Sequence, residues 1–488
     1  MTSHPGRLAL LIGAVVLVTV TAGAAVHDPL ITAGLVLLLA LVYFAARMDG
    51  WQRLLALTVV LLVCAASHLA PLADTAFYPR YVAVGCLVAW TACLPGRPGT
   101  RLDRWTGAFV VALWATAVVA TVSGVWSITP AHTFQQGVAL VLLAGLVHAL
   151  VRRRWTDQAI VIGDLYVVYL VLSLSVVVSI GYGLVDGTVA AAVSSGERFR
   201  GVYNNPNLLS AICALTIPLG WAVHRQSRRR VQLLGALAAA FALVLSESRT
   251  GLIAVLVGGL WIALRHGMGP LRRLVAVGAT VFLLAQAFNL LPAIVGSSWV
   301  QQFVGRFTAP ETGELSNGRT QLWQAAVELW WQSRPALGFG YGSGLYLFDQ
   351  ARDNDFFAVG VSLVHNSYLQ MLLELGLAGA VPLLVLVLAA LRVVLRAPMS
   401  RVNPGLVWLV LTGLLIQITE SAIFGTGQPY PYVFWPTVAA VLLGLPDPHR
   451  ADRVPAGVPQ AARAGGGAVP SHPEQRQPAR EAGTAAPR

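Results

Sequence analysis

The chain has 488 residues, of which 56% are hydrophobic and only 11% are charged. Soluble domains carry about 25% charged residues, so this composition excludes an ordinary soluble enzyme and indicates a polytopic membrane protein. The net charge of +12 would suit a nucleic-acid-binding protein, but the placement of the charges argues against that function.

Apolar runs along the chain predict an all-α membrane protein with about 12–14 transmembrane helices, since about 17–25 apolar residues cross a bilayer. The candidate spans are roughly 8–26, 30–46, 54–70, 80–95, 107–125, 133–151, 159–185, 208–223, 231–247, 250–264, 272–291, 367–391, 405–423 and 431–446. We interpret the first span as an uncleaved anchor rather than a signal peptide, because many more spans follow it.

The arginines indicate how these spans are oriented. All 33 basic residues are Arg, and outside the C-terminal tail most of them fall in alternate loops, at 47–53, 97–104, 152–154, 225–230, 265–273 and 392–401. The positive-inside rule then places both termini in the cytoplasm. The loop 186–207, the SESRT turn and the long loop 292–365 are predicted to be extracytoplasmic.

The four cysteines, Cys64, Cys86, Cys93 and Cys213, all fall inside apolar segments. No pair has metal-ligand spacing, so we interpret them as small core residues.

The loop 292–365 is too long to be a simple connection. Leu322, Ala325, Ala326 and Leu329 have helical spacing and lie among three tryptophans, which predicts an amphipathic helix at the membrane interface. Tryptophans are also simply favoured at interfaces. Alternate glycines follow at 338, 340, 342 and 344, which predicts a flexible or closely approached segment.

His365 begins the next span, and an unperturbed His can accept a proton near neutral pH. It is therefore a candidate general base, although a single His at a helix end is often structural. Asn366, Gln370 and Glu374 follow on one helix face, and burying a carboxylate at this depth predicts that the face points into the bundle. Gly376 and Gly379 would allow close helix packing.

Three arginines on the predicted outer side, Arg200, Arg249 and Arg319, are candidate phosphate ligands, because guanidinium is always charged and binds oxyanions bidentately. The alternative is that each extends to lipid headgroups. Asn205 and Asn207 precede or begin a helix, with Asn207 as the expected N-cap, and could contact sugar hydroxyls.

Three acidic residues are weaker candidates. Asp353 and Asp355 are interpreted as solvated loop charges rather than as a cation site, and Glu420 lies at an outer span end.

The motif His-Asn-x9-Gly-x-x-Gly at His365, Asn366, Gly376 and Gly379, placed after the largest outer loop, resembles the O-antigen ligase and polymerase superfamily of membrane glycosyltransferases. YNNPN at 203–207, SRTG at 248–251, GRTQLW at 318–323 and PALGFGYGSG at 335–344 support the resemblance. It covers about 200–425. It divides the chain into N-terminal spans (1–200), a ligase-like catalytic region (201–446) and a disordered cytoplasmic tail (447–488).

The resemblance implies a GT-C-like fold in the cytoplasmic membrane with an extracytoplasmic active site. It implies transfer of a glycan from undecaprenyl pyrophosphate to an acceptor hydroxyl, without metal or cofactor. His365 would be the base. Arg249 and Arg319 would hold the pyrophosphate, with Arg200 as a weaker candidate and with Asn366, Glu374, Asn205 and Asn207 in support.

Several alternatives stay open. A repeat-unit polymerase and a protein O-oligosaccharyltransferase would use the same chemistry with a different acceptor. A lipid-linked glycan flippase would be expected to have polar residues spread through the membrane midplane and roughly repeated halves. A cell-wall polymerase of the shape and division family would depend on an outer acidic residue such as Asp353 or Asp355.

Overall fold

The structure of the protein is a computed structural model, which describes residues 48–95, 102–194, 197–266, 269, 301, 319–344, 346, 347, 364–399 and 402–444. Contacts divide the chain into two units, Met1–Leu445 and Pro446–Arg488, and all described residues belong to the first. The predicted disordered tail, the spans at 8–26, 30–46 and 272–291, and Asp353 and Asp355 lie outside the described residues.

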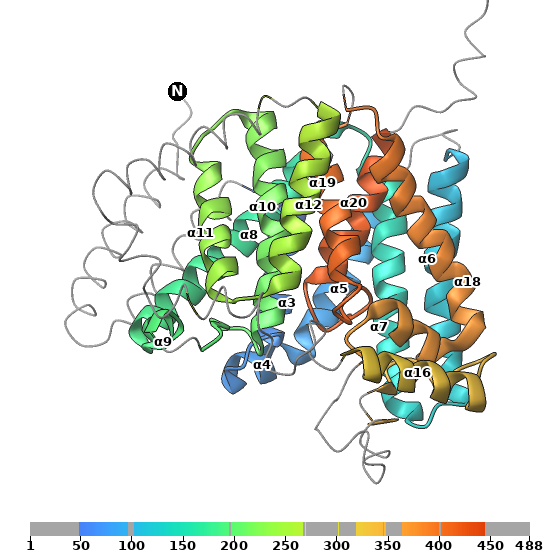
Figure 1. Ribbon diagram of the computed structural model, residues 1–488. Coiled ribbons are helices and arrows are strands. Elements are labelled where there is room, and N and C mark those ends of the chain that lie inside the picture. Colours follow the sequence, from blue (N-terminus) through green and yellow to red (C-terminus); the bar gives the residue numbers. More distant parts are fainter. Residues whose placement is uncertain are drawn as a thin grey trace, which may run out of the picture. The chain divides into compact units, whose positions relative to one another are not determined.

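The described residues form a bundle of helices without strands (Figure 1). Every predicted span within them overlaps a helix. The helices are α3 (Gly50–Ala65), α4 (Ala70–Phe77), α5 (Pro79–Cys93), α6 (Arg104–Val122), α7 (Pro130–Ala149), α8 (Gln158–Val185), α9 (Thr188–Ser194), α10 (Pro206–Ser227), α11 (Gln232–Leu245), α12 (Arg249–His266), α16 (Arg319–Ser333), α18 (Ser367–Arg396), α19 (Pro404–Ile416) and α20 (Tyr430–Gly444).

The length and composition of these helices confirm the predicted class. Among the described residues, five helices, beginning at Arg104, Pro130, Gln158, Pro206 and Ser367, are long and apolar enough to cross a membrane, and shorter apolar helices accompany them. The protein is an all-α polytopic membrane protein.

Short polar side chains determine where several helices begin. Asp49, Asp103 and Asp157 each accept a hydrogen bond from a backbone N–H in the first turn of α3, α6 and α8. Asn205 does the same for α10 by accepting from the Leu208 N–H. The prediction that Asn207 caps α10 was wrong: Pro206 takes the first helical position, which moves the cap to Asn205.

Two sets of turns lie at opposite ends of the bundle. At one end, which we call the α16 end, the His68 N–H donates to the Val202 carbonyl and the Phe199 N–H to the Leu245 carbonyl. At the other end, Arg153 and Arg265 donate to the carbonyls of Leu94 and Val394. The described parts of the loops predicted to be extracytoplasmic lie at the α16 end (Figure 1). The side of the membrane that this end faces stays a prediction.

The predicted amphipathic helix is α16, which lies across the lower ends of α7 and α18 in Figure 1. Ala326 is buried, and Leu322, Ala325 and Leu329 pack in the same small cluster. The indole N–H groups of two tryptophans in α16 donate hydrogen bonds to the carbonyls of Val364 and Pro335.

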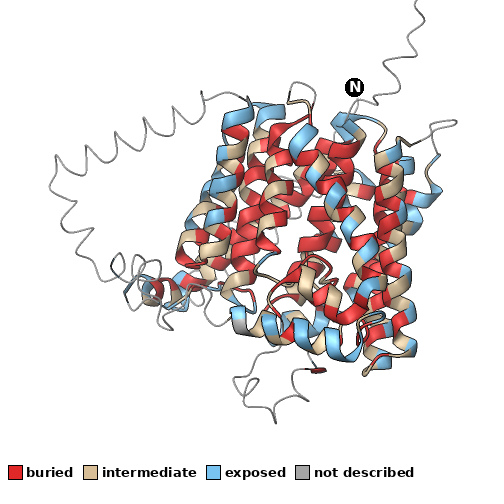
Figure 2. Cartoon of the chain, turned by 45° about the vertical axis from the view of Figure 1, so that its right-hand side comes forward, coloured by how far each residue is buried: buried red, intermediate tan, exposed pale blue. Residues whose placement is uncertain are grey.

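Burial separates the inner helices from the outer ones (Figure 2). Nearly every residue in the first four turns of α10 is buried, whereas α6, α11 and α12 expose large apolar side chains such as Val111, Leu237 and Leu256. Contact of an apolar side chain with lipid acyl chains carries no free-energy penalty. The apolar surfaces of α6, α11 and α12 are therefore expected to face lipid. Cys213 is a core residue as predicted, but Cys86 and Cys93 are exposed on α5, which contradicts the prediction for them.

Helix α18 is broken at Gly376, whose φ of 60° and ψ of −156° are open essentially only to glycine. In an unbroken helix, the N–H groups of Leu377 and Ala378 would donate to the carbonyls of Leu373 and Glu374.

The glycine-rich segment 335–344 replaces both of these hydrogen bonds. The N–H groups of Phe339 and Gly340 donate to the Leu373 and Glu374 carbonyls, and the Leu377 and Ala378 N–H groups donate to the Pro335 and Ala336 carbonyls. The break is therefore fully satisfied by protein, as a membrane interior requires. The prediction that Gly376 serves close helix packing was wrong, because the backbone that packs closely against Gly376 belongs to the segment 335–344 and not to another helix.

Substituting Gly376→Ala should destabilise the protein. A Cβ there would lie 2.5 Å from the Ala336 carbonyl carbon, and the backbone conformation alone costs about 1–3 kcal/mol for a non-glycine residue. We expect a lower apparent Tm of the detergent-solubilised protein by tryptophan fluorescence. Gly181→Ala in α8 is the control, because its Cβ would meet nothing within 4 Å. Equal Tm values for the two variants would contradict this account.

Candidate functional site

The turn after α19 brings together residues that are far apart in the sequence. Arg319 Nη1 donates to the Thr419 carbonyl at 2.5 Å, and its Nη2 lies 3.4 Å from Glu420 Oε1. The other carboxylate oxygen of Glu420 lies 3.9 Å from His365 Nδ1. Glu420 therefore stands between the predicted base and a predicted phosphate ligand. Because only 15% of the Glu420 side chain is exposed, solvent screens the charge of its carboxylate only partly.

His365 is held in an unusual backbone conformation. Its φ is +52°, in the left-handed region that few non-glycine residues adopt, and its side chain is 36% exposed. The residues after it are fixed: the Asn366 N–H donates to Ser421 Oγ, and the Ser367 N–H is shared between the carbonyls of Gln417 and Glu420. Such conformations persist only where the surroundings enforce them, and they cluster at functional sites.

Arg249 begins α12 beside the same turn. The hydroxyl of the next residue, Thr250, accepts a hydrogen bond of 2.7 Å from Thr419 Oγ1. Since Arg319 binds the backbone carbonyl of Thr419, Thr419 joins Arg319 to the first turn of α12, which Arg249 begins.

Arg200 is not part of this group. Its side chain is exposed, whereas its neighbour Arg198 turns inward to bind the Ser246 carbonyl and the Asn207 side chain. Asn207 thus has a protein partner and Asn205 is a helix cap. Their proposed sugar contacts stay predictions.

Asn366 and Glu374 have clear local partners. Asn366 caps α18 by accepting from the N–H groups of Tyr368 and Leu369. Glu374 is buried, and its two oxygens accept from the N–H groups of Gly342 (2.8 Å) and Gly344 (3.2 Å) and from the Gln370 amide (2.5 Å). The polar face of α18 points inward as expected, and Glu374 anchors the glycine-rich segment.

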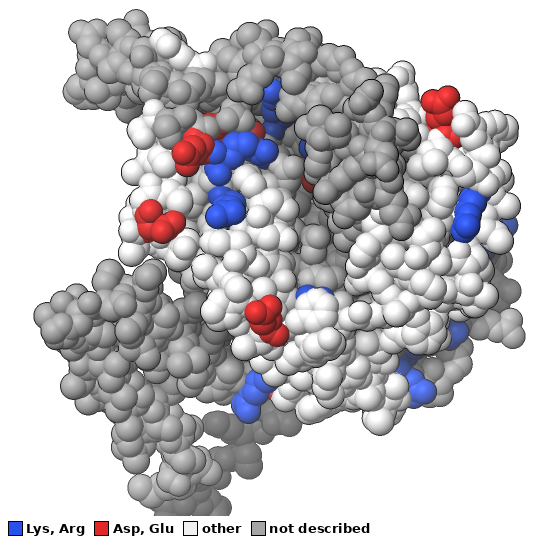
Figure 3. Space-filling model, turned by 90° about the horizontal axis from the view of Figure 1, so that it is seen from below, with Lys and Arg blue, Asp and Glu red and all other residues white. Residues whose placement is uncertain are grey.

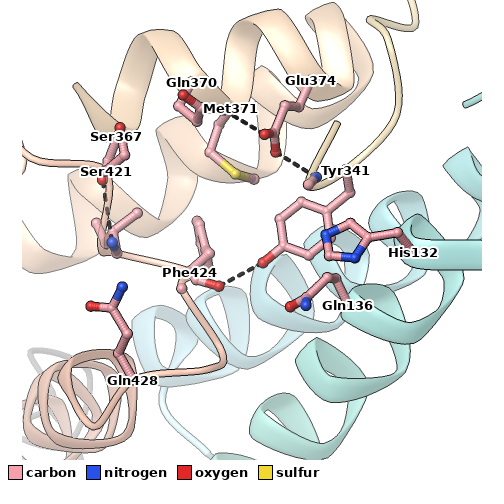
Figure 4. Close-up of a pocket in the computed structure, with 13 residues that line it drawn as sticks. His132, Gln136, Tyr341, Ser367, Gln370, Met371, Glu374, Ser421, Phe424 and Gln428 are labelled. Carbon is pink, nitrogen blue, oxygen red and sulfur yellow. Dashed lines mark hydrogen bonds between the residues drawn. The ribbon is translucent and has the colours of Figure 1, made fainter. Parts of the chain in front are cut away.

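A cavity of about 210 Å³ lies next to these residues (Figure 4). Its walls come from α7, α18, the glycine-rich segment and the turn after α19. Among the lining residues are His132, Gln136, Tyr341, Ser367, Gln370, Met371, Glu374, Ser421, Phe424 and Gln428. Ser421 connects the cavity to His365, because its hydroxyl accepts the N–H of the residue that follows His365.

Tyr341 closes one side of the cavity. Burial raises the pKa of its hydroxyl well above the usual value, so the group stays protonated and donates to the Phe424 carbonyl at 2.6 Å. The Tyr341 N–H donates to Ser123 Oγ. The cavity wall is therefore tied to the turn between α6 and α7.

A buried arginine supports the turn that lines the cavity. Arg80 is 4% exposed, packs its guanidinium over the rings of Phe77 and Tyr81, and approaches the Gly427 carbonyl at 3.4 Å. Seen from the α16 end, the described surface is mostly uncharged and carries a few charged groups at scattered positions (Figure 3).

The sequence interpretation did not identify His132, Gln136 or Gln428, and it ranked Glu420 low. None of them stands in a recognisable motif; the only signal was that His132 and Gln136 begin a span at the predicted outer side, one helical turn apart. In the described part of the chain, no group of three or more His, Cys, Asp or Glu side chains is arranged to hold a metal ion.

The fold and this site define an all-helical membrane protein with a polar site at one end of the bundle. Residues 234–384 match the family model described as O-antigen ligase. This match confirms the resemblance to the O-antigen ligase and polymerase superfamily and supports a ligase- or polymerase-type function. A search of curated proteins finds no match to the chain.

The matched region contains Arg249, Arg319, His365 and the broken part of α18. The cavity residues of α7 and of the turn after α19 lie outside it. The match therefore covers the residues of the sequence motif but only part of the cavity.

Substituting Glu374→Leu should destabilise the glycine-rich segment. It removes the acceptor of two buried backbone N–H groups, and each unpaired group costs about 1–3 kcal/mol. We expect faster hydrogen exchange in 335–344 and a lower Tm. Glu328→Leu on the exposed face of α16 is the control and should change neither the hydrogen exchange nor the Tm. Unchanged hydrogen exchange in the Glu374 variant would show that the carboxylate does not anchor the segment.

Proposed function

We propose that this protein is a membrane glycosyltransferase that moves a glycan from undecaprenyl pyrophosphate to an acceptor hydroxyl. The observation that carries the proposal is the convergence of His365, Glu420 and Arg319 on one turn beside a polar cavity. The same turn is hydrogen-bonded to the first turn of α12, which Arg249 begins. The family match over 234–384 supports the same class of reaction.

In the proposed reaction, the acceptor oxygen forms a bond to the anomeric carbon of the donor sugar. The bond from that carbon to the pyrophosphate oxygen breaks, and its electron pair leaves with the lipid pyrophosphate. The proton of the acceptor hydroxyl goes to His365, acting as general base. Glu420, which lies 3.9 Å from the imidazole, would orient it and stabilise its charged form.

Arg319 and Arg249 would hold the pyrophosphate, with Arg200 in a weaker, outer role. Guanidinium groups stabilise the negative charge that develops on the leaving group, so the proposed reaction needs no metal or cofactor. Arg319 is paired with Glu420 in the structure, so donor binding would share or replace that contact.

The arginine distribution supports an active site at the outer face of the cytoplasmic membrane, with both termini cytoplasmic. A lipid-linked donor would then approach from the bilayer. The acceptor, whether a lipid-linked glycan, another glycan or a protein hydroxyl, would come from the extracytoplasmic side.

Substituting His365→Ala in the host should abolish function. Loss of a general base typically lowers a rate by about 10²–10⁴-fold, so the variant should resemble the gene deletion at equal membrane abundance. Surface and lipid-linked glycans would be compared by chain length. Gln332→Ala on the exposed side of α16 is the control and should complement fully.

The glycan profile also separates the acceptor classes. Long glycans retained on the lipid carrier in the variant indicate a ligase, and single repeats at the surface indicate a polymerase. Loss of glycan from proteins alone indicates protein O-glycosylation. A normal profile from His365→Ala would refute the catalytic role and favour a transporter.

Substituting Arg319→Ala should chiefly weaken donor use. A hydrogen bond to a charged group is worth about 1.5–3 kcal/mol, which corresponds to a rise of about 10–150-fold in the KM for the lipid-linked donor. Arg319→Lys should recover only part of this loss, because an ammonium cannot bind two phosphate oxygens in parallel. An unchanged donor KM in both variants would exclude Arg319 from the pyrophosphate site.

A further inference from the structure

We propose that the cavity beside His365 is the subsite for one neutral sugar ring of the acceptor. This inference rests on the proposed function and specifies its acceptor as a glycan rather than a protein side chain. It also assigns a role to His132 and Gln136 of α7 and to Gln428 of the turn after α19.

The chemistry of the lining suits a sugar. Hydroxyl, amide and imidazole groups project from separate elements toward one space, with the rings of Tyr341 and Phe424 beside them (Figure 4). Sugars present hydroxyls that donate and accept, together with C–H faces that pack on aromatic rings. Small-molecule sites commonly combine apolar walls with a few such directed polar groups.

Some of these groups have hydrogen-bonding capacity to spare. Among the described residues, the ring nitrogens of His132 and the amide of Gln428 have no hydrogen-bond partner, and the His132 ring packs edge-on against Tyr346 at 5.4 Å between centroids. Gln136 uses its carbonyl to accept from Thr426, which leaves its amide N–H groups available. Polar groups left over in a cavity need water or a ligand.

The charge of the lining favours a neutral ring. Among the described residues, no Arg, Lys or Asp lines the cavity, and the one carboxylate that does, Glu374, already accepts three hydrogen bonds from the protein. An acidic sugar would lack a counter-charge here, and burying an unpaired charge is costly.

The position of the cavity favours the acceptor over the donor. Arg319 donates to the Thr419 carbonyl, and the hydroxyl of Thr250, the residue after Arg249, accepts from the Thr419 hydroxyl. The cavity begins at Ser421, on the other side of Glu420. Ser421 also binds the Asn366 N–H, next to His365, whereas Arg319 and Arg249 are not among the described residues that line the cavity. In the proposed arrangement, a ring in the cavity presents a hydroxyl to His365, and the pyrophosphate is held by the arginines outside the cavity.

The size limits the ligand to one ring. The volume of about 210 Å³ is that of roughly seven water molecules at about 30 Å³ each and is smaller than the roughly 300–1,000 Å³ pockets of drug-sized ligands. Further sugars of an acceptor chain would lie outside the cavity.

The test uses full-length protein in lipid nanodiscs, with lipid-linked donor and glycan acceptor isolated from the deletion strain. His132→Ala and Gln428→Ala should each raise the acceptor KM by about tenfold, with donor KM and kcat changed less than about twofold. Two variants on separate elements are used, so that a folding defect in one, seen as a lower Tm, leaves the other informative. Gln332→Ala is the control.

The outcomes separate this inference from the proposed function. If wild-type protein transfers no glycan from the lipid-linked donor, the proposed function itself fails. If wild type is active and both variants keep the wild-type acceptor KM, the cavity is not the acceptor subsite. A raised donor KM with an unchanged acceptor KM in the variants would assign the cavity to the donor and overturn the inference. The inference would also fail if the wild-type protein transferred glycan to a protein acceptor as well as to the glycan acceptor.

Discussion

The insertion of the segment 335–340 into the break of α18 is the interaction on which the site depends. Two helical hydrogen bonds are missing at Gly376, and four hydrogen bonds to the loop replace them. In a bilayer no water would compensate for a broken helix, so a gap of this kind persists only when protein fills it. Gly338 and Gly376 face each other's backbones so closely that a side chain on either would collide.

This junction determines where the polar groups of the site lie. Continuing past the break, the glycine-rich segment places the Gly342 and Gly344 N–H groups on the buried Glu374 carboxylate, which turns the segment back across α7. Tyr341 is thereby fixed to the Phe424 carbonyl, and both residues line the cavity. A buried carboxylate is costly alone, but three donors offset its desolvation.

The second constraint is electrostatic and lies at the end of the bundle. Glu420 pairs with Arg319 and faces His365, so one carboxylate coordinates a cation and a base. Because all these groups are partly exposed, their mutual attraction alone adds little stability. The turn after α19 instead contributes to the arrangement of the site, because its backbone carbonyls and hydroxyls hold α12, α16 and α18 together. These contacts bring together the groups to which we assign separate roles in the proposed reaction.

The sequence by itself determined the class and the helical spans within the described residues, because the length of an apolar run is a local property of the chain. The orientation predicted from the arginines stays a prediction. His365, Arg249 and Arg319 were predicted as site residues from residue type and from the resemblance, and their roles stay proposals. The inward face carrying Glu374 followed from helical periodicity. Only the tertiary structure decided that Glu420 joins His365 to Arg319, that Asn205 rather than Asn207 caps α10, and that Gly376 breaks α18. The cavity between α7 and the turn after α19 was likewise beyond the sequence, since its walls are separated by some 290 residues and meet only through packing.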